Sequence, residues 1–153
     1  MAVIKKKEQD PHKVYAIAGD GEMQEGQMWE ALMAAAHYKL DNLVLIVDYN
    51  KLSSSHPTNE IINLEPLAEK MKAFHYHVIE IDGHDMEQIL AAIKEAKAVN
   101  GMPVMILADT VKGKGVRFME HVPKWHSSGL TDEEYKTAME DLAREEEELV
   151  HGV

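Results

Sequence analysis

Two short polar stretches contain the residue types that hold a divalent cation in proteins. Asp20 stands between Gly19 and Gly21 directly after an apolar run, and Asn50 follows the next apolar run thirty positions later. A carboxylate and an amide oxygen are hard ligands, which suit Mg²⁺ or Ca²⁺ better than a soft metal. The glycines allow close approach of the backbone to a bulky anion, and a helix beginning near Gly26 would point free N–H groups toward it. This pattern predicts a metal and diphosphate site.

Alternating strand-like and helical segments would have to position these residues. Four apolar runs are typical of strands, at residues 14–18, 43–48, 77–81 and 104–109. Four segments have helical periodicity, at residues 26–38, 65–74, 86–99 and 131–150. Nearly continuous apolar strands that alternate with helices indicate right-handed βαβ units and a parallel sheet. We therefore expect an α/β fold of three layers, with helices on both faces of a parallel sheet.

The ends of the predicted strands are polar, and ligands of open parallel sheets bind beyond the carboxyl ends of strands. The four ends read "GDG" at 19–21, "DYN" at 48–50, "DGHD" at 82–85 and "DTVKGKG" at 109–115. Ordinary turn chemistry explains any one of them alone, because Gly and Asp tolerate turn geometry and cap helices. The first two ends indicate more together, since one helix and one strand separate Asp20 from Asn50 and both side chains can point into one crevice.

Composition and charge limit the classes of protein to which this chain can belong. The 153 residues suffice for one domain. Residues 131–153 hold nine acidic and two basic residues, a balance of −7, which leaves −4 of the total −11 for residues 1–130. Such charge argues against a nucleic-acid surface. The chain has no cysteine and no apolar run of about 20 residues, so we expect no thiolate metal site, no membrane span and a cytoplasmic location.

A series of motifs extends from about residue 14 to residue 142. The string "GDGEMQEGQMWEA" is followed in order by "VDYNKL", "EPLAEKMKAF", "VIEIDGHD", "TVKGKGVRFME" and "WHSSG". "GDG" alone would be a weak signal, but this colinear series resembles the N-terminal subunit of a transketolase of the kind divided between two genes. The resemblance implies one thiamine diphosphate-binding domain over residues 1–153, with an acidic helix at residues 131–150.

The resemblance also implies which residues form the site. The metal ligands would be the side chains of Asp20 and Asn50 and the carbonyl oxygen of Leu52. Residues implied to contact thiamine diphosphate are Gly19, Asp20, Gly21, Glu22, Asn50, Leu52 and His126. His126 resembles the histidine that faces the diphosphate and the donor substrate.

Two acidic residues of the first helix carry a further implied role. Glu25 and Glu30 resemble the acidic pair that couples the two active sites of the family's dimer, so Glu25 joins His126 as a catalytic candidate. The alternative is that both glutamates simply complement the positive N-terminal end of the helix.

Family members transfer a two-carbon ketol unit between sugar phosphates, which places the implied activity in the pentose phosphate pathway. The glutamate that activates the cofactor lies on a partner, the C-terminal, pyrimidine-binding subunit. By this resemblance the chain is a transferase component that anchors Mg²⁺ (or Ca²⁺) and the cofactor diphosphate. We expect no ketol transfer from the isolated chain.

Several features depart from the family. Ser127 follows His126 where a glycine is usual, and His56 replaces another common glycine. The family's upstream segment with its "GHP" motif is missing, and "KKKEQDPHK" is typical of the end of a helix and its loop, which indicates an N-terminally truncated domain. One alternative is an inactive remnant or interaction module. Another is a different thiamine diphosphate enzyme, such as deoxyxylulose phosphate synthase or a dehydrogenase E1 component, although "KGKG" and "WH" favour transketolase.

Exposed apolar surface is predicted at two helices. The helix at residues 26–38 has too broad an apolar surface for a single stripe facing a sheet, so we expect the chain to form a homo-oligomer. The last helix shows Tyr135, Met139, Leu142 and Leu149 along one side, which would dock on the body of the domain or on a partner.

Overall fold

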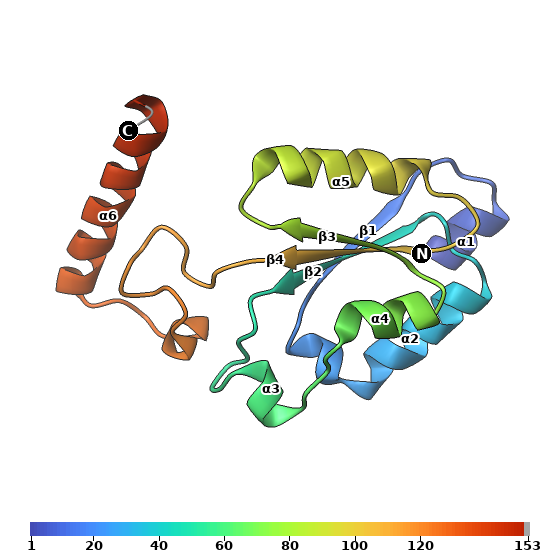
Figure 1. Cartoon of the computed structure of the whole chain (residues 1–153), viewed down its shortest axis with the longest axis horizontal. Helices are drawn as coiled ribbons and strands as arrows, with labels where there is room; N and C mark the ends of the chain where they lie inside the picture. The colour runs from blue at the N-terminus through green and yellow to red at the C-terminus, as the bar shows by residue number, and fades with distance from the viewer. Residues whose placement is uncertain (152–153) are drawn as a thin grey trace.

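A four-stranded parallel sheet forms the centre of the protein in a computed structural model, which describes residues 1–151 (Figure 1). Its strands are β1 (Val14–Gly19), β2 (Leu43–Tyr49), β3 (His77–Asp82) and β4 (Val104–Asp109). Their order across the sheet is β1-β2-β4-β3. Each parallel pairing needs a crossover connection, and helices supply these crossovers. The expected parallel α/β fold is therefore confirmed.

Helices cover the two faces of this sheet unequally. The described helices are α1 (Ala2–Lys7), α2 (Gly26–His37), α3 (Thr58–Ile61), α4 (Leu67–Ala73), α5 (Met86–Ala98) and α6 (Asp132–His151), with the short 3₁₀ helices η1 (Glu22–Gln24) and η2 (Pro123–His126). Figure 1 shows α2 and α4 on one face and α5 on the other. Within the described residues, no helix is both long and apolar enough to cross a bilayer.

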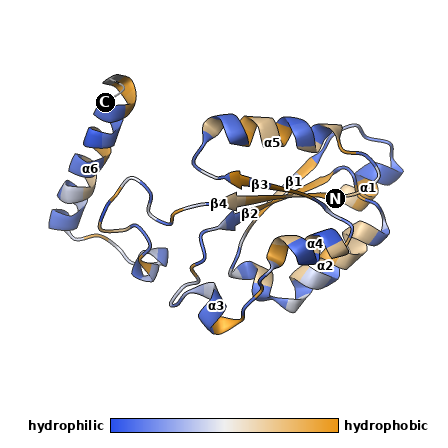
Figure 2. Ribbon diagram, in the orientation of Figure 1, coloured by the Kyte–Doolittle hydropathy of each residue, from blue (hydrophilic) through white to orange (hydrophobic). Residues whose placement is uncertain are grey.

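The core lies on both faces of the sheet, because the strands are apolar on both sides (Figure 2). Under α2 and α4 it contains fully buried Met23, Met71 and Met105. Under α5 it contains Val44, Ala92, Ala96, Val104 and Ile106. Methionine has a flexible, polarizable side chain that fills irregular gaps between such layers.

The α5 face leaves β1 largely open. Ile17 of β1 is 76% exposed, although it belongs to a strand. Beside it lies an apolar groove of about 210 Å³, lined in part by Ile46, Ile89, Ile93 and Ile106. Helix α5 contacts β3, and the apolar cluster beneath it includes residues of β2, β3 and β4 but none of β1.

Candidate metal site

Asp20 is placed at the carboxyl edge of the sheet by the pairing of β1 with β2. Gly19 pairs with Asp48, and the N–H of Asp20 continues this ladder with a 3.1 Å hydrogen bond to the Asp48 carbonyl. The Asp20 side chain is only 3% exposed. Its Oδ1 accepts the N–H of Gly21 at 2.8 Å, and its Oδ2 accepts the N–H of Lys51 at 2.5 Å. The carboxylate is therefore directed at the turn that follows β2.

Asn50 belongs to that same turn and is also buried, with 7% of its surface exposed. Its Oδ1 accepts the N–H of Leu52 at 2.9 Å, and its Nδ2 donates to Oδ2 of Asp48 at 3.0 Å. The hydroxyl of Thr110 donates to the other oxygen of Asp48. Because an ionised carboxylate only accepts hydrogen bonds, Asp48 fixes the amide nitrogen of Asn50 and leaves Oδ1 facing the turn.

Leu52, the third ligand implied by the sequence, lies in an ordered turn. It forms an isolated antiparallel bridge with Pro57, and the N–H of Ser53 donates to the carbonyl of His56 at 2.9 Å. The turn from Lys51 to Leu52 thus donates hydrogen bonds to both implied side-chain ligands. The structure brings Asp20, Asn50 and Leu52 together.

The electrostatics of this cluster favour a cation. Burial raises the pKa of Asp20, and the negative charge of Asp48 raises it further. A nearby cation would offset both effects by stabilising the carboxylate. Within residues 1–151 no group of three His, Asp or Glu side chains is arranged to hold a metal. A cation here would therefore use mixed carboxylate, amide and carbonyl oxygens, a donor set that fits Mg²⁺ or Ca²⁺.

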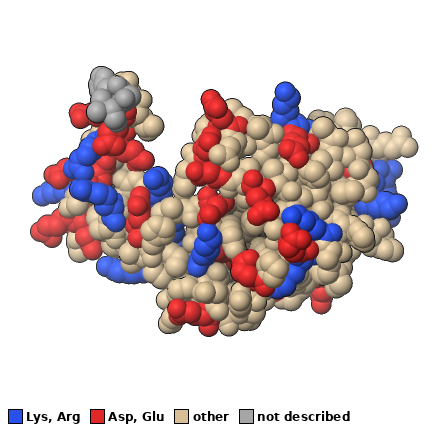
Figure 3. Space-filling view, in the orientation of Figure 1, with Lys and Arg blue, Asp and Glu red and all other residues tan. Residues whose placement is uncertain are grey.

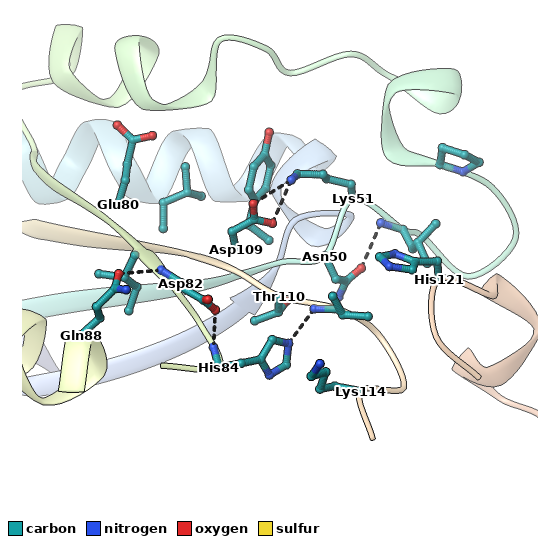
Figure 4. Close-up of a pocket in the computed structure, with 16 residues that line it drawn as sticks. Asn50, Lys51, Glu80, Asp82, His84, Gln88, Asp109, Thr110, Lys114 and His121 are labelled. Carbon is teal, nitrogen blue, oxygen red and sulfur yellow. Dashed lines mark hydrogen bonds and ion pairs between the residues drawn. The ribbon is translucent and has the colours of Figure 1, made fainter. Parts of the chain in front are cut away.

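A hollow of about 900 Å³ adjoins the cluster on one side (Figure 4). Asn50 and Leu52 line it, together with the Lys51–Asp109 ion pair, whose atoms are 2.8 Å apart. Across the hollow, Nε2 of His84 accepts the N–H of Val111 at 2.7 Å. Asp20 instead lines a smaller pocket of about 20 Å³. Tyr49 lines both the small pocket and the large hollow.

The glycines and Glu22 lie beside the cluster. A Cβ added at Gly19 would meet no atom within 4 Å, whereas one at Gly21 would contact Ser53 at 3.5 Å. Glu22 begins η1 and is exposed. This 3₁₀ turn, which the sequence pattern did not predict, separates Asp20 from α2. The N-terminus of α2 itself lies at Gly26, where the sequence predicted it.

The remaining sequence candidates lie outside the hollow. Glu25 precedes α2, accepts a 2.6 Å hydrogen bond from Gln27 and is exposed, as is Glu30. His126 ends η2, is exposed, and is absent from the lining of the hollow among the described residues. Two histidines that the sequence pattern did not single out, His84 and His121, line it instead.

The role of Asp48 was also missed from the sequence. The spacing between Asp48 and Asn50 could have indicated this role, because residues i and i+2 of an extended segment lie on the same face of the sheet. An acidic residue at that spacing can fix the amide of the candidate ligand.

Buried polar side chains beyond the carboxyl ends of adjacent parallel strands are typical of open α/β domains, whose ligands bind at that edge of the sheet. Comparison with known proteins identifies the family. Residues 4–150 match the family described as transketolase, thiamine diphosphate binding domain, and the chain belongs to this family.

Relatives and solved structures agree with this assignment. The chain is 44% identical over 145 residues to the 6-deoxy-6-sulfo-D-fructose transketolase subunit SqwG of Clostridium sp. (strain MSTE9), covering 95% of this chain and 53% of the relative. It is 39% identical over 149 residues to an apulose-4-phosphate transketolase subunit of Phocaeicola vulgatus, covering 97% and 53%. The transketolase structure from Campylobacter jejuni matches with a TM-score of 0.86 and 35% identity, covering 93% of this chain and 23% of that one. The chain thus spans about half the length of these two curated relatives.

Proposed function

We propose that this chain is the cofactor-anchoring part of a transketolase-type transferase. In this proposal Asp20, Asn50 and the carbonyl oxygen of Leu52 hold Mg²⁺, or Ca²⁺, against the diphosphate of thiamine diphosphate. The observation that carries the proposal is that the buried side chains of Asp20 and Asn50 converge on the backbone of residues 51 and 52. Membership of a thiamine diphosphate-binding family supports the identity of the anion.

The residues around this cluster have separate roles in the proposed site. Asp48 orients the Asn50 amide, and the backbone of Gly21 meets the diphosphate. The open space at Gly19 gives the anion room, and Glu22 and His126 approach it from neighbouring turns. Bound thiamine diphosphate would supply the electron sink for moving a two-carbon ketol unit between sugar phosphates, while the protein supplies position and polarity.

A partner subunit completes the enzyme in this proposal. Two relatives are named as transketolase subunits, which supports a separate C-terminal subunit that binds the pyrimidine and carries the activating glutamate. Glu25 and Glu30 are proposed to couple two active sites across a homodimer, in agreement with their exposure. The matching relatives are transketolases, which favours this activity over deoxyxylulose phosphate synthase or a dehydrogenase E1 component.

Anchoring alone should not produce turnover. Contacts to the diphosphate bind the cofactor in its ground state and in the transition state about equally, so they lower no chemical barrier. The isolated chain is therefore expected to bind cofactor weakly and to leave sugar phosphates unchanged. Transfer from xylulose 5-phosphate by the purified chain would refute this part of the proposal.

Calorimetry with thiamine diphosphate and Mg²⁺ tests the anchoring role. Wild-type chain should give heat of binding that Asp20→Ala and Asn50→Ala remove. The control is Glu80→Gln, because Glu80 lines the hollow away from the cluster. Equal heats from wild type and Asp20→Ala would overturn the metal site and leave an interaction module as the better description.

A further inference from the structure

Three residues form a row across the carboxyl edge of the sheet. Asp109 of β4 pairs with the last residues of β2 and β3, and the next residues on these three strands are Asn50, Thr110 and Gly83. The N–H of Gly83 continues the ladder with a 2.7 Å hydrogen bond to the carbonyl of Asp109, and the N–H of Thr110 lies 3.4 Å from the carbonyl of Tyr49. Thr110 therefore lies between the candidate ligand Asn50 and the turn that follows β3 (Figure 4).

The side chain of Thr110 is fixed by contacts on two sides. Its methyl group occupies the space that a side chain at residue 83 would need, because a Cβ added at Gly83 would lie 2.4 Å from Cγ2 of Thr110. Its hydroxyl donates to Oδ1 of Asp48. A side chain branched at Cβ has a stiff χ1 angle, so the position of the methyl group also determines where the hydroxyl points.

Asp48 transmits this orientation to Asn50. Oδ2 of Asp48 accepts a hydrogen bond from Nδ2 of Asn50 at 3.0 Å, while Thr110 occupies Oδ1. Because both oxygens are engaged, the carboxylate cannot rotate without losing a hydrogen bond. Without the hydroxyl of Thr110 the carboxylate is free to turn, and the amide of Asn50 can exchange its oxygen for its nitrogen. The nitrogen of an amide is a donor and offers no lone pair to a cation.

Thr110 has no charge, so it can contribute orientation but not attraction for a cation. Negative charge at this edge comes from other residues: Glu80, Asp82 and Asp109 line the hollow, and Figure 3 shows acidic side chains near the ends of the strands. This general attraction is screened by salt. Loss of the hydroxyl should therefore reduce affinity for a cation by a factor that persists at high salt.

We propose that Thr110 is a positioning residue of the metal site and acts on Asn50 through Asp48. Position 83 is glycine, in this proposal, because a side chain there would displace Thr110. The glycine of the "DGHD" turn thereby affects a ligand that lies two strands away in the sheet. The identity of Asn50 as a metal ligand rests on the proposed function, whereas the arrangement of the three side chains rests on their own contacts.

Two substitutions at residue 110 separate positioning from packing. Thr110→Val keeps the methyl contact and loses the hydroxyl, whereas Thr110→Ser keeps the hydroxyl and loses the methyl group. In calorimetry with thiamine diphosphate and Mg²⁺, Thr110→Val should weaken the Kd about ten-fold, and Thr110→Ser should bind nearly as wild type. The opposite order would indicate a packing role and overturn the proposal. The control is Thr137→Val, which removes an exposed hydroxyl of α6 and should leave the Kd unchanged.

The metal-free chain provides a second readout. In an isotope-labelled sample, the side-chain amide protons of Asn50 report on the hydrogen bond to Asp48 in the absence of any cation. Their resonances should shift, and their exchange with water should accelerate, in Thr110→Val but not in Thr110→Ser or Thr137→Val. An Asn50 amide that is unchanged in Thr110→Val would overturn the proposal.

The path through Asp48 and the role of Gly83 need their own variants. In an Asp48→Ala background, Thr110→Val should cause no further loss of affinity, because residues of one hydrogen-bond chain are not additive. Additive losses would show that Thr110 does not act through Asp48. Gly83→Ala should weaken the Kd as Thr110→Val does, and its control is Gly129→Ala, where the added methyl group meets no atom within 4 Å. Far-UV circular dichroism verifies that each variant is folded.

Asp20→Ala distinguishes failure of this proposal from failure of the proposed function. Equal heats from wild type and Asp20→Ala would overturn the metal site and the positioning role together. Loss of binding in Asp20→Ala combined with an unchanged Kd in Thr110→Val would overturn the positioning role alone. Loss in both, with binding retained in Thr110→Ser, is the result that we expect.

Discussion

Asn50 donates a 3.0 Å hydrogen bond from Nδ2 to the carboxylate of Asp48, two residues earlier in the chain. This contact fixes which end of the amide faces the turn at Leu52. Partners that orient a ligand typically change metal affinity by about 10- to 100-fold when removed. We expect Asp48→Ala to weaken Mg²⁺-dependent binding of thiamine diphosphate by about that factor, as measured by calorimetry.

The conservative variant separates orientation from charge. Asp48→Asn can still present an oxygen to Asn50, so it should retain more affinity than Asp48→Ala. Asp132→Asn, at the exposed first residue of α6, serves as the control and should bind as wild type. Equal losses in both Asp48 variants would show that its charge matters and its orienting bond does not.

Three glycines allow backbone conformation and space to be tested separately. Gly113 has φ +79°, and a Cβ there would approach the backbone of Met119 at 2.7 Å. Gly101 also has φ +79° but has open space, while Gly129 has open space. Substitution by Ala should reduce the free energy of unfolding by about 3 kcal/mol at Gly113, about 1 at Gly101 and about 0 at Gly129. Chemical denaturation measures the series, and equal effects at Gly113 and Gly101 would contradict it.

Acidic pH should release α6 from the rest of the chain. Hydrogen bonds from Arg117 hold the pKa of Asp141 below its ordinary value of 3.8. A carboxyl with a lowered folded-state pKa contributes stability above its unfolded pKa and loses it as the pH falls through the folded value. Amide exchange of residues 132–150 should therefore accelerate as the pH is lowered below about 4, after correction for the intrinsic rate.

Substitutions at two adjacent acidic residues, Asp141 and Glu140, provide the test and its control. Asp141→Asn should show fast exchange in α6 already at neutral pH, whereas Glu140→Gln, at an exposed position, should behave as wild type. Slow exchange in Asp141→Asn at every pH would show that the Arg117 contact does not hold the helix.

Self-association should also involve the open part of the α5 face, which lies on the side of the sheet opposite α2 and is a second contact besides the one proposed for Glu25 and Glu30. Ile17 and the other apolar residues of the adjoining groove form one continuous exposed surface. Contiguous apolar surface of this kind typically marks an interaction site. We expect sedimentation velocity to show species larger than a monomer at micromolar concentration, and Ile17→Lys to shift them toward monomer. Ile62→Lys, at an exposed position next to α3, should not. A clean wild-type monomer would contradict this expectation.

Much of the fold was predictable because its strands are apolar runs closed by polar turns. The predicted strands end within one residue of β1, β2, β3 and β4. Asp20 and Asn50 could be placed at one edge because parallel strands of successive βαβ units bring their carboxyl ends together. The position of β4 between β2 and β3 was not predictable, because the pattern of apolar residues indicates where strands lie in the sequence but not which strands pair.

The rest of the candidate site depends on features without periodicity. The turn η1 and the long segment between β4 and α6 are irregular and stabilised by individual contacts, such as the 2.9 Å hydrogen bond from the Trp29 indole to the Met23 carbonyl of η1. Sequence spacing could not show that His84 and His121 line the hollow. The roles of His126, Glu25 and Glu30 came from resemblance alone and stay predictions.

The strand order has a consequence for synthesis on the ribosome. β3 pairs with β4 alone among the described strands, and β4 lies beyond α5 in the chain. A nascent chain that has emerged only as far as α5 can pair β1 with β2. The strand that pairs with β3 has not yet emerged at that stage. The backbone groups of β3 therefore stay unpaired until Val104 to Asp109 have left the exit tunnel. Translation through β4 is consequently the step at which this sheet can close, and a pause before it prolongs the exposure of an unpaired strand to aggregation.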